Sequence, residues 1–348
     1  GLYLHVPFCQ TKCPYCDFNT YSGIEEQIPG YVRALEAELE GWGSLLERPP
    51  VRTIFLGGGT PSYLPAEYIR DIMAVIKRSF KLESSAEITM ECNPGDVTSK
   101  NAAFWLAAGI NRISMGVQSF DDGLLTLLGR RHTALEAKQA FKTLRGAGFE
   151  NQSLDLIYGL PYQTVEQWSD TLKQTIALNP DHVSLYGLQI EQGTPLAVDV
   201  EAGKYPVPDD DLAADMYEEA QRQLAVNGFQ QYEISNWGKE GFESRHNLIY
   251  WMNEPYLGVG PGAHSWLVGQ RFANLKSPRR YVTVVGNDYK LQGADPVATM
   301  HTPAGPVDQV DITTPAVDIA ETMMMGMRLN KGVSYKRFEE RFGIGMDI

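Results

Sequence analysis

The sequence predicts an α/β protein built on a partial, open (β/α)6 barrel of the TIM type, with an accessory region and a small C-terminal helical domain. In the first 205 residues, short apolar segments alternate about six times with segments of helical periodicity, which favours a parallel sheet with helices outside it. Glycine or polar residues follow these apolar segments, where the functional groups of a barrel gather. Six units fall short of the eight in a complete barrel, so we expect an open one.

The predicted strands have short apolar cores and span residues 2–7, 53–56, 87–91, 112–117, 153–157 and 182–188. The helices between them place apolar residues on one side and span residues 31–46, 65–80, 101–108, 134–147 and 165–178. In the first of these helices, Leu35, Leu39 and Trp42 share a face. Gly109 and Gly148 directly follow two of the helices, as is typical of helix C-termini.

The alternation stops after residue 205. The remaining sequence predicts an amphipathic helix at 211–226, a strand at 230–237, a polar loop at 288–310, a Met-rich helix at 316–329 and another helix beginning at 335–342. We therefore divide the chain into a barrel domain at 1–205, an accessory α+β region at 206–310 and the start of an incomplete helical domain at 311–348.

Composition excludes several classes of function. The 348 residues carry a formal net charge of -13, which argues against binding DNA or RNA through the phosphate backbone. No apolar run approaches the ~20 residues of a membrane-spanning helix. The four cysteines do not form a disulfide framework, because three lie in one loop and Cys92 has no evident partner. We expect a protein of the reducing cytoplasm.

Cys9, Cys13 and Cys16 form a C-x3-C-x2-C loop. Thiolates gathered on one loop are soft ligands that suit iron–sulfur clusters or zinc. Structural zinc usually has four ligands in two pairs, and no second pair follows here. Three sulfurs on a four-iron cluster would leave one iron open to another ligand. Cys92 lies next to Glu91, and strand alternation turns the two side chains apart, so we expect a structural thiol there.

The cysteine loop resembles the signature of radical S-adenosylmethionine (SAM) enzymes. The resemblance implies that Cys9, Cys13 and Cys16 hold a [4Fe–4S] cluster whose fourth iron chelates the amino and carboxylate groups of SAM. An electron donor would then allow cleavage of SAM to methionine and a 5′-deoxyadenosyl radical. The flanking residues 3–8 and 14–18 narrow the resemblance to the oxygen-independent coproporphyrinogen III oxidase (HemN) group, which includes the haem chaperones of the HemW type.

The resemblance also implies a SAM site at the strand ends. The matching positions are Tyr3, Tyr15, Gly58, Gly59, Thr60, Glu91, Gln118, Arg130 and Asp155. Carboxylates can accept hydrogen bonds from the ammonium and ribose hydroxyls of SAM, and arginine can pair with its carboxylate. Arg131 is an alternative to Arg130. Taken singly, each position is better explained as a capped turn or a solvated charge; their joint spacing favours SAM.

Three features favour the HemW type over HemN enzymes. HemN enzymes carry a further cysteine two residues after the third, where this chain has Phe18, and a long segment ahead of the cluster loop, where this chain has eight residues. Residues 246–251 match the H-N-x-x-Y-W motif associated with haem binding in HemW. The resemblance implies that His246 ligates haem iron while Tyr250 and Trp251 pack on the macrocycle. The alternative is a core histidine with core aromatics.

The leading hypothesis is a haem chaperone that delivers haem to a respiratory protein. The alternative is an enzyme, an oxidoreductase that decarboxylates coproporphyrinogen III propionates oxidatively to give protoporphyrinogen IX. A third hypothesis is a radical SAM protein with an unrelated substrate. The expected partners are haem or porphyrinogen, a haem acceptor and an electron donor. The resemblance is compatible with a homodimer, and with a location in the cytoplasm at the periphery of the inner membrane.

Overall fold

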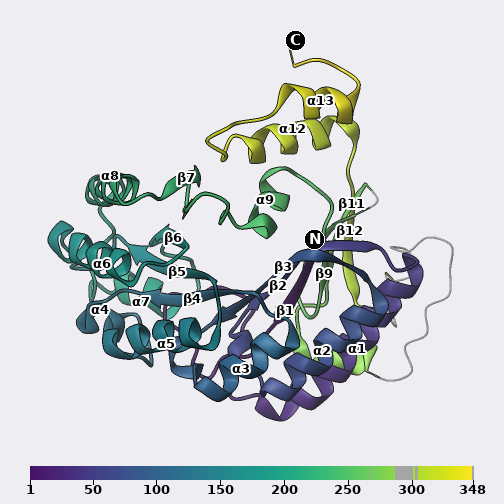
Figure 1. Cartoon of the computed structure of the whole chain (residues 1–348), viewed down its shortest axis with the longest axis horizontal. Coiled ribbons are helices and arrows are strands. Elements are labelled where there is room, and N and C mark those ends of the chain that lie inside the picture. The colour runs from purple at the N-terminus through teal and green to yellow at the C-terminus, as the bar shows by residue number, and fades with distance from the viewer. Residues whose placement is uncertain (268, 287–300, 302–304, 347–348) are drawn as a thin grey trace.

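The computed structural model describes residues 1–267, 269–286, 301 and 305–346. Its centre is a nine-stranded sheet with the order β7-β8-β6-β5-β4-β3-β2-β1-β9 (Figure 1). The strands β1 to β6 are parallel and adjacent in chain order. They span Leu2–Val6, Pro50–Gly58, Lys81–Cys92, Arg112–Gln118, Asn151–Tyr158 and His182–Gly187. The predicted alternation and the six parallel strands are confirmed.

One face of this sheet is covered by helices that connect its strands (Figure 1). They are α1 (Ile28–Leu45), α2 (Ala66–Ser79), α3 (Ser99–Ala108), α5 (Ala134–Ala147) and α6 (Val165–Leu178). Trp42, Trp105 and Trp168 are fully buried beneath them. Thr133 and Thr164 begin α5 and α6 with reciprocal capping boxes, which satisfy backbone donors that a helix leaves unpaired. Short connections add α4 (Asp122–Leu127) and the 3-10 turns η1 (Glu25–Gln27), η2 (Pro61–Tyr63) and η3 (Pro94–Asp96).

The accessory region extends both edges of the sheet. The strands β8 (Asn236–Gly238) and β7 (Gln230–Glu233) continue it antiparallel beyond β6. The strand β9 (Leu257–Val259) adds parallel to β1 at the other edge. The sheet is thus open, with β7 and β9 as its edges within the described residues. The single strand expected at 230–237 is instead two strands joined by a tight turn.

The same region also forms a separate antiparallel sheet of β10 (His264–Leu267), β11 (Gln270–Asn274) and β12 (Val307–Ile312). The predicted loop at 288–310 is therefore wrong at 307–310, where a strand pairs with β11. This strand has polar and acidic residues on an exposed face, which explains why its apolar content did not reveal it. Residues 288–300 and 302–304 of that loop lie outside the described residues.

Six further helices complete the described part of the chain. They are α7 (Pro195–Glu201), α8 (Asp210–Val226), α9 (Arg245–Trp251), α10 (Pro278–Val285), α12 (Pro315–Gly326) and α13 (Tyr335–Phe342). The helix α9 lies on the opposite side of the sheet from α1, α2 and α3 (Figure 1). The C-terminal pair α12 and α13 stands beyond α9, away from the sheet (Figure 1). No helix among the described residues has the length and apolar character needed to cross a membrane.

Candidate functional site

The cysteine loop follows the carboxyl end of β1. Backbone hydrogen bonds join the start of this loop to the glycine segment at the end of β2. The backbone N–H groups of Gly59 and Thr60 donate to the carbonyls of Val6 and Phe8 at 2.7 and 2.8 Å. The loop closes on itself where the Cys9 N–H donates to the Tyr21 carbonyl at 2.9 Å. Backbone hydrogen bonds alone therefore place the predicted glycine segment against the predicted metal-binding loop.

Each of the three loop thiols is half-buried and has a polar neighbour. The Thr60 hydroxyl donates to Cys9 Sγ at 3.4 Å, and Arg130 Nη1 donates to Cys13 Sγ at 3.4 Å. The Thr20 hydroxyl lies 4.0 Å from Cys16 Sγ. Donors that face sulfur stabilise negative charge on it, which is the state that ligates metal.

These residues fit an iron–sulfur cluster in their donor chemistry. Burial raises the pKa of the Cys9 thiol, although the Thr60 hydroxyl opposes this, and burial likewise raises the pKa of Cys16. A bound cation deprotonates such thiols outright. In the described part of the chain, no three Cys, His, Asp or Glu side chains converge on a single metal ion. A cubane cluster instead spreads its ligands over separate iron atoms.

A cavity of about 620 Å³ opens beside the cysteine loop. Predicted SAM residues Tyr3, Gly58 and Glu91 line it from β1, β2 and β3. This volume lies within the range of roughly 300–1,000 Å³ that is typical of small-molecule sites. Three of the nine positions at which the resemblance implies SAM therefore line one cavity beside the cysteine loop, and the other six do not line it.

Glu91 is one of two acidic residues that line this cavity, and the other, Asp17, is exposed. Its Oε2 accepts the backbone N–H of Gly58 at 3.0 Å. Burial, together with the nearby carboxyl of Asp155, raises the pKa of Glu91 to about 8. Burying a carboxylate is costly without a counter-charge, so the cavity favours a cationic occupant that restores the ionised form.

His5 also lines the cavity. Both nitrogens of its ring have hydrogen-bond partners, as is usual for a buried histidine. Its Nε2 lies 3.0 Å from the Asn19 carbonyl, and its Nδ1 lies 3.0 Å from the Tyr3 hydroxyl. Because a carbonyl only accepts, Nε2 carries the proton and Nδ1 accepts from Tyr3. Burial lowers the pKa of His5, which keeps the ring neutral.

Arg130 lies beside Cys13, and the side chains of Arg130 and Gln118 both lie near Gly116 at the end of β4. Arg130 Nη2 donates to the Gly116 carbonyl at 2.7 Å, so the guanidinium bridges the end of β4 and Cys13. Gln118 adopts a left-handed backbone with φ of 69°, which is uncommon for a residue other than glycine. Burial works against the charge of Arg130, but Tyr15 and Cys13 together raise its pKa. Tyr15 thus lies with Arg130 at the cysteine loop.

Arg131, the alternative to Arg130, is directed elsewhere. Its guanidinium pairs with Asp96 at 2.5 Å and also donates to Gln10. This leaves Arg130 as the arginine at the cysteine sulfurs.

Asp155 is half-buried on β5 and held by hydroxyl groups. Ser114 donates to both of its oxygens at 2.8 and 3.0 Å, and Ser153 donates at 3.1 Å. Burial raises the pKa of Asp155, while the hydrogen bond from Ser114 opposes the rise. Gln118, Arg130 and Asp155 are not among the residues that line the cavity.

His246 lies in the interior, apart from the cysteine loop. It is completely buried and stacks on Phe55 at 5.3 Å between ring centroids. Its Nδ1 lies 2.8 Å from the Thr53 hydroxyl, and its Nε2 lies 2.8 Å from the Tyr250 hydroxyl. Both ring nitrogens are therefore engaged within the protein.

Sequence reasoning missed the part of the cavity wall that comes from the accessory region. His264 and Lys276 of this region line it together with the barrel residues. Asn19 fastens this wall to the cysteine loop by donating to the carbonyls of Pro261 and Lys276 at 3.0 and 2.9 Å. These contacts join residues more than two hundred positions apart, and no local pattern signals them.

Comparisons with known proteins cover almost the entire chain. Residues 3–175 match the model of the radical SAM superfamily, and residues 313–347 match the HemN C-terminal domain. The heme chaperone HemW of Bacillus subtilis is 37% identical over 99% of this chain and 87% of its own length. The heme chaperone HemW of Escherichia coli is 42% identical over 76% of this chain and 69% of its own length.

A solved structure shares the fold. Coproporphyrinogen III oxidase (HemN) from Escherichia coli, a radical SAM enzyme, superposes with a TM-score of 0.83 over 99% of this chain and 78% of its own, at 24% identity. At that identity the likeness concerns the fold alone. Together with the sequence matches, it confirms the fold class and the family resemblance predicted from the cysteine loop. The chain belongs to the radical SAM superfamily and, within it, to the family of the heme chaperone HemW.

Proposed function

We propose that this protein is a haem chaperone that binds haem and delivers it to a respiratory haem protein. The observation that carries the proposal is the similarity to the HemW of Bacillus subtilis, at 37% identity over 99% of the chain. A match of that extent includes the accessory region and the C-terminal helices as well as the barrel, so it concerns more than the cofactor site.

Membership in the radical SAM superfamily implies a [4Fe–4S] cluster and SAM. We assign the cluster to Cys9, Cys13 and Cys16, whose sulfurs have Thr60, Arg130 and Thr20 beside them. SAM bound to such a cluster can supply radical chemistry once an electron arrives. The chain's own contribution is to hold the thiols together, to exclude water from them and to orient SAM.

We assign SAM to the adjoining cavity, which Tyr3, Gly58 and Glu91 line, and to the strand ends beside it. Its contacts are proposed to come from Tyr3, Tyr15, Gly58, Gly59, Thr60, Glu91, Gln118, Arg130 and Asp155. Glu91 would become ionised beside the positive charge of SAM, and the glycines would let the backbone approach the methionyl group. Arg130 would fix the orientation of a carboxylate next to Cys13.

The haem site is proposed to involve the segment 246–251, where the family motif lies. Direct ligation of iron by His246 stays a prediction, and it would require the ring to give up its hydrogen bond to Thr53 or to Tyr250. The remaining proposed partners are a haem acceptor and an electron donor. Delivery to a respiratory protein would place the chain in the cytoplasm, at the membrane periphery, and a homodimer is compatible with this role.

An anaerobic titration of the cluster-reconstituted protein with haem, followed at the Soret band, tests the proposal. We expect saturable binding near one haem per chain and transfer to an apo-haem protein. The same preparation is then given SAM, a reductant and coproporphyrinogen III. Decarboxylation of the porphyrinogen without saturable haem binding would replace the chaperone by the oxidoreductase.

A further inference from the structure

A second cavity of about 540 Å³ lies between α9 and the C-terminal helices. It is separate from the cavity beside the cysteine loop, with which it shares no lining residue. Its apolar wall combines two residues of the family motif with residues of the C-terminal helical part. The main apolar groups are Leu248, Trp251, Met252, Leu329, Val333 and Phe338. The motif thus contributes Leu248 and Trp251 to this wall, while His246 is enclosed on the other side of α9.

The opposite orientation of these side chains follows from helix geometry. Residues 246 and 250 are four apart and share the face of α9 that packs against Thr53 and the sheet. Residues 248, 251 and 252 lie on the other face, toward α12 and α13. The motif therefore has an inner half that anchors α9 and an outer half that is available to a ligand.

The rim of the cavity carries positive charge. Lys331, Arg337 and Arg341 line it, together with the acidic residues Glu243 and Glu340. Lys331 has no carboxylate partner within the described part of the chain. Arg337 pairs with the carboxylate of Glu254 through Nη2 and donates to Met252 Sδ at 2.6 Å through Nη1, so Lys331 is the cation of the rim that is open to a ligand carboxylate. An apolar slot with cations at its mouth matches a flat apolar molecule that carries carboxylates on one edge.

The cavity also offers an iron ligand. Thioether sulfur and phenol oxygen both serve as axial ligands of haem iron, and Met252 and Tyr232 line the wall. The Tyr232 hydroxyl is held at 2.9 Å from His182 Nε2 and accepts the Ser244 N–H at 3.2 Å. Met252 Sδ has only the arginine contact described above, so Met252 is the better placed of the two.

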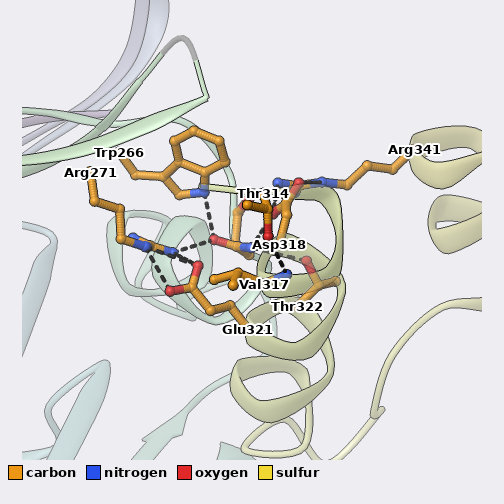
Figure 2. Close-up of polar contacts among 9 residues, drawn as sticks. Trp266, Arg271, Thr314, Val317, Asp318, Glu321, Thr322 and Arg341 are labelled. Carbon is orange, nitrogen blue, oxygen red and sulfur yellow. Dashed lines mark hydrogen bonds and ion pairs between the residues drawn. The ribbon is translucent and has the colours of Figure 1, made fainter. Parts of the chain in front are cut away.

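A network of polar contacts holds α12, which forms the wall of this cavity across from α9, against the residue Asn253. Figure 2 shows Trp266, Arg271, Asp318, Glu321, Thr322 and Arg341 converging at the start of α12. The amide of Asn253, directly after Met252, donates to Asp318 and Thr322 at 2.9 Å and accepts from Trp266 Nε1 at 2.6 Å. The network ties α12 to the residue that follows Met252, so the two walls of the cavity keep a fixed separation.

From these observations we infer that this second cavity is the haem site. Haem lies between the outer face of α9, at Leu248 and the edge of Trp251, and the C-terminal helices; Met252 supplies a ligand to the iron, and Lys331 receives a propionate. His246 lies on the inner face of α9, buried and bonded to Thr53, and has no contact with the haem. The inference rests on the proposed haem-chaperone function and names its binding site.

The test measures haem affinity and the Soret and visible spectra of the reconstituted full chain and of matched variants. Leu248→Glu places a carboxylate on the apolar wall and should weaken haem binding by at least about tenfold. Met252→Leu keeps the volume and should shift the ligand-dependent bands toward a five-coordinate spectrum. Lys331→Glu should weaken binding by about three- to tenfold. His246→Gln should keep both the wild-type spectrum and an affinity within about twofold.

Controls use the same chemical changes away from the cavity. Leu135→Glu and Met324→Leu alter exposed side chains, and Lys173→Glu alters an exposed lysine of α6. Melting curves and the iron content of the cluster identify any variant that fails to fold. If other variants fail, the spectrum of Met252→Leu, the mildest change, shows whether Met252 ligates the haem iron. If the wild type binds haem and the cavity variants bind it equally well, the second cavity is not the haem site. The same conclusion follows if only His246→Gln loses haem binding. In both cases the proposed chaperone function is unaffected. No saturable haem binding by the wild type overturns both.

Discussion

The carboxyl group of Glu91 on β3 is joined to the backbone N–H of Gly58, 3.0 Å away at the end of β2. Gly58 has a φ of 108°, and a side chain there would collide with the ring of His5. The hydrogen bond therefore depends on a glycine at that position. It fixes the orientation of Glu91 while leaving its second oxygen for a ligand.

The binding of SAM should depend on pH through Glu91. Its pKa of about 8 means that the apo group is protonated at neutral pH, and a cationic ligand favours the ionised form. Affinity should therefore rise as pH increases and level off above about 8, with a proton released on binding below it. Calorimetry in buffers of different ionisation enthalpy measures both quantities. If Glu91→Gln shows the same pH slope as the wild type, Glu91 is not the group responsible.

Loss of one loop cysteine should abolish the cluster, whereas loss of Cys92 should not. Cys92 is buried, and its Sγ donates to the Asn93 carbonyl at 3.4 Å, consistent with the expected structural thiol. After anaerobic reconstitution, Cys13→Ala should lose most of its bound iron, sulfide and visible absorbance. Cys92→Ala should retain them, with a stability loss of about 1 kcal/mol from the vacated space. Full iron and sulfide in Cys13→Ala would contradict the ligand assignment.

The two adjacent arginines should differ in their effect on SAM. Arg130 contacts Cys13 and Gly116, whereas Arg131 pairs with Asp96. Arg130→Lys removes the planar fork and should weaken SAM binding by about tenfold, the equivalent of ~1.4 kcal/mol. Arg131→Lys should change it by less than about twofold. Equal effects of the two substitutions, at equal cluster content, would assign the role to neither residue.

Protein stability should decrease with pH because of Glu38, a buried carboxyl on α1. It accepts hydrogen bonds from the Tyr281 hydroxyl, the Asn274 amide and the Gly260 N–H at 2.5, 2.7 and 2.8 Å. Burial raises its pKa from 4.5 to about 7, so the folded state binds more protons than the unfolded state. The unfolding free energy should fall by on the order of 3 kcal/mol as pH rises from about 4.5 to above 7.

Denaturant unfolding across that pH range measures the Glu38 contribution. Glu38→Gln should remove this part of the pH dependence, because an amide does not titrate. Glu38→Ala should be less stable than the wild type at every pH, since it removes the buried carboxyl that accepts hydrogen bonds from Tyr281, Asn274 and Gly260. A wild-type profile that rises through the same range would show that other groups dominate.

The parallel core was predictable from sequence because each of its units is local. A buried apolar strand, a polar strand end and an amphipathic helix recur within a few dozen residues, and neighbouring units pair in chain order. The cysteine spacing was equally local, and it led to the family. The SAM, cluster and haem residues remain predictions that the experiments above test.

The rest depended on contacts between distant residues. The strand β9 pairs with β1 although more than two hundred residues separate them, and Asn19 reaches Lys276 in the same way. The sequence identified the motif at 246–251 but not the directions in which its side chains point. Only the fold reveals that His246 faces Thr53 while Trp251 faces the C-terminal helices.

In the proposed role the protein must release haem as well as bind it, and the network around Asn253 affects the rate of that release. The attachment of α12 relies on polar contacts such as Arg271 with Glu321 at 2.6 Å and Arg341 with Asp318 at 2.7 Å. Half-buried ion pairs exchange for water and counter-ions more readily than an apolar seam opens. The dissociation rate of a ligand bound behind this helix should therefore increase with ionic strength. The protein itself should stay folded over the same range of salt.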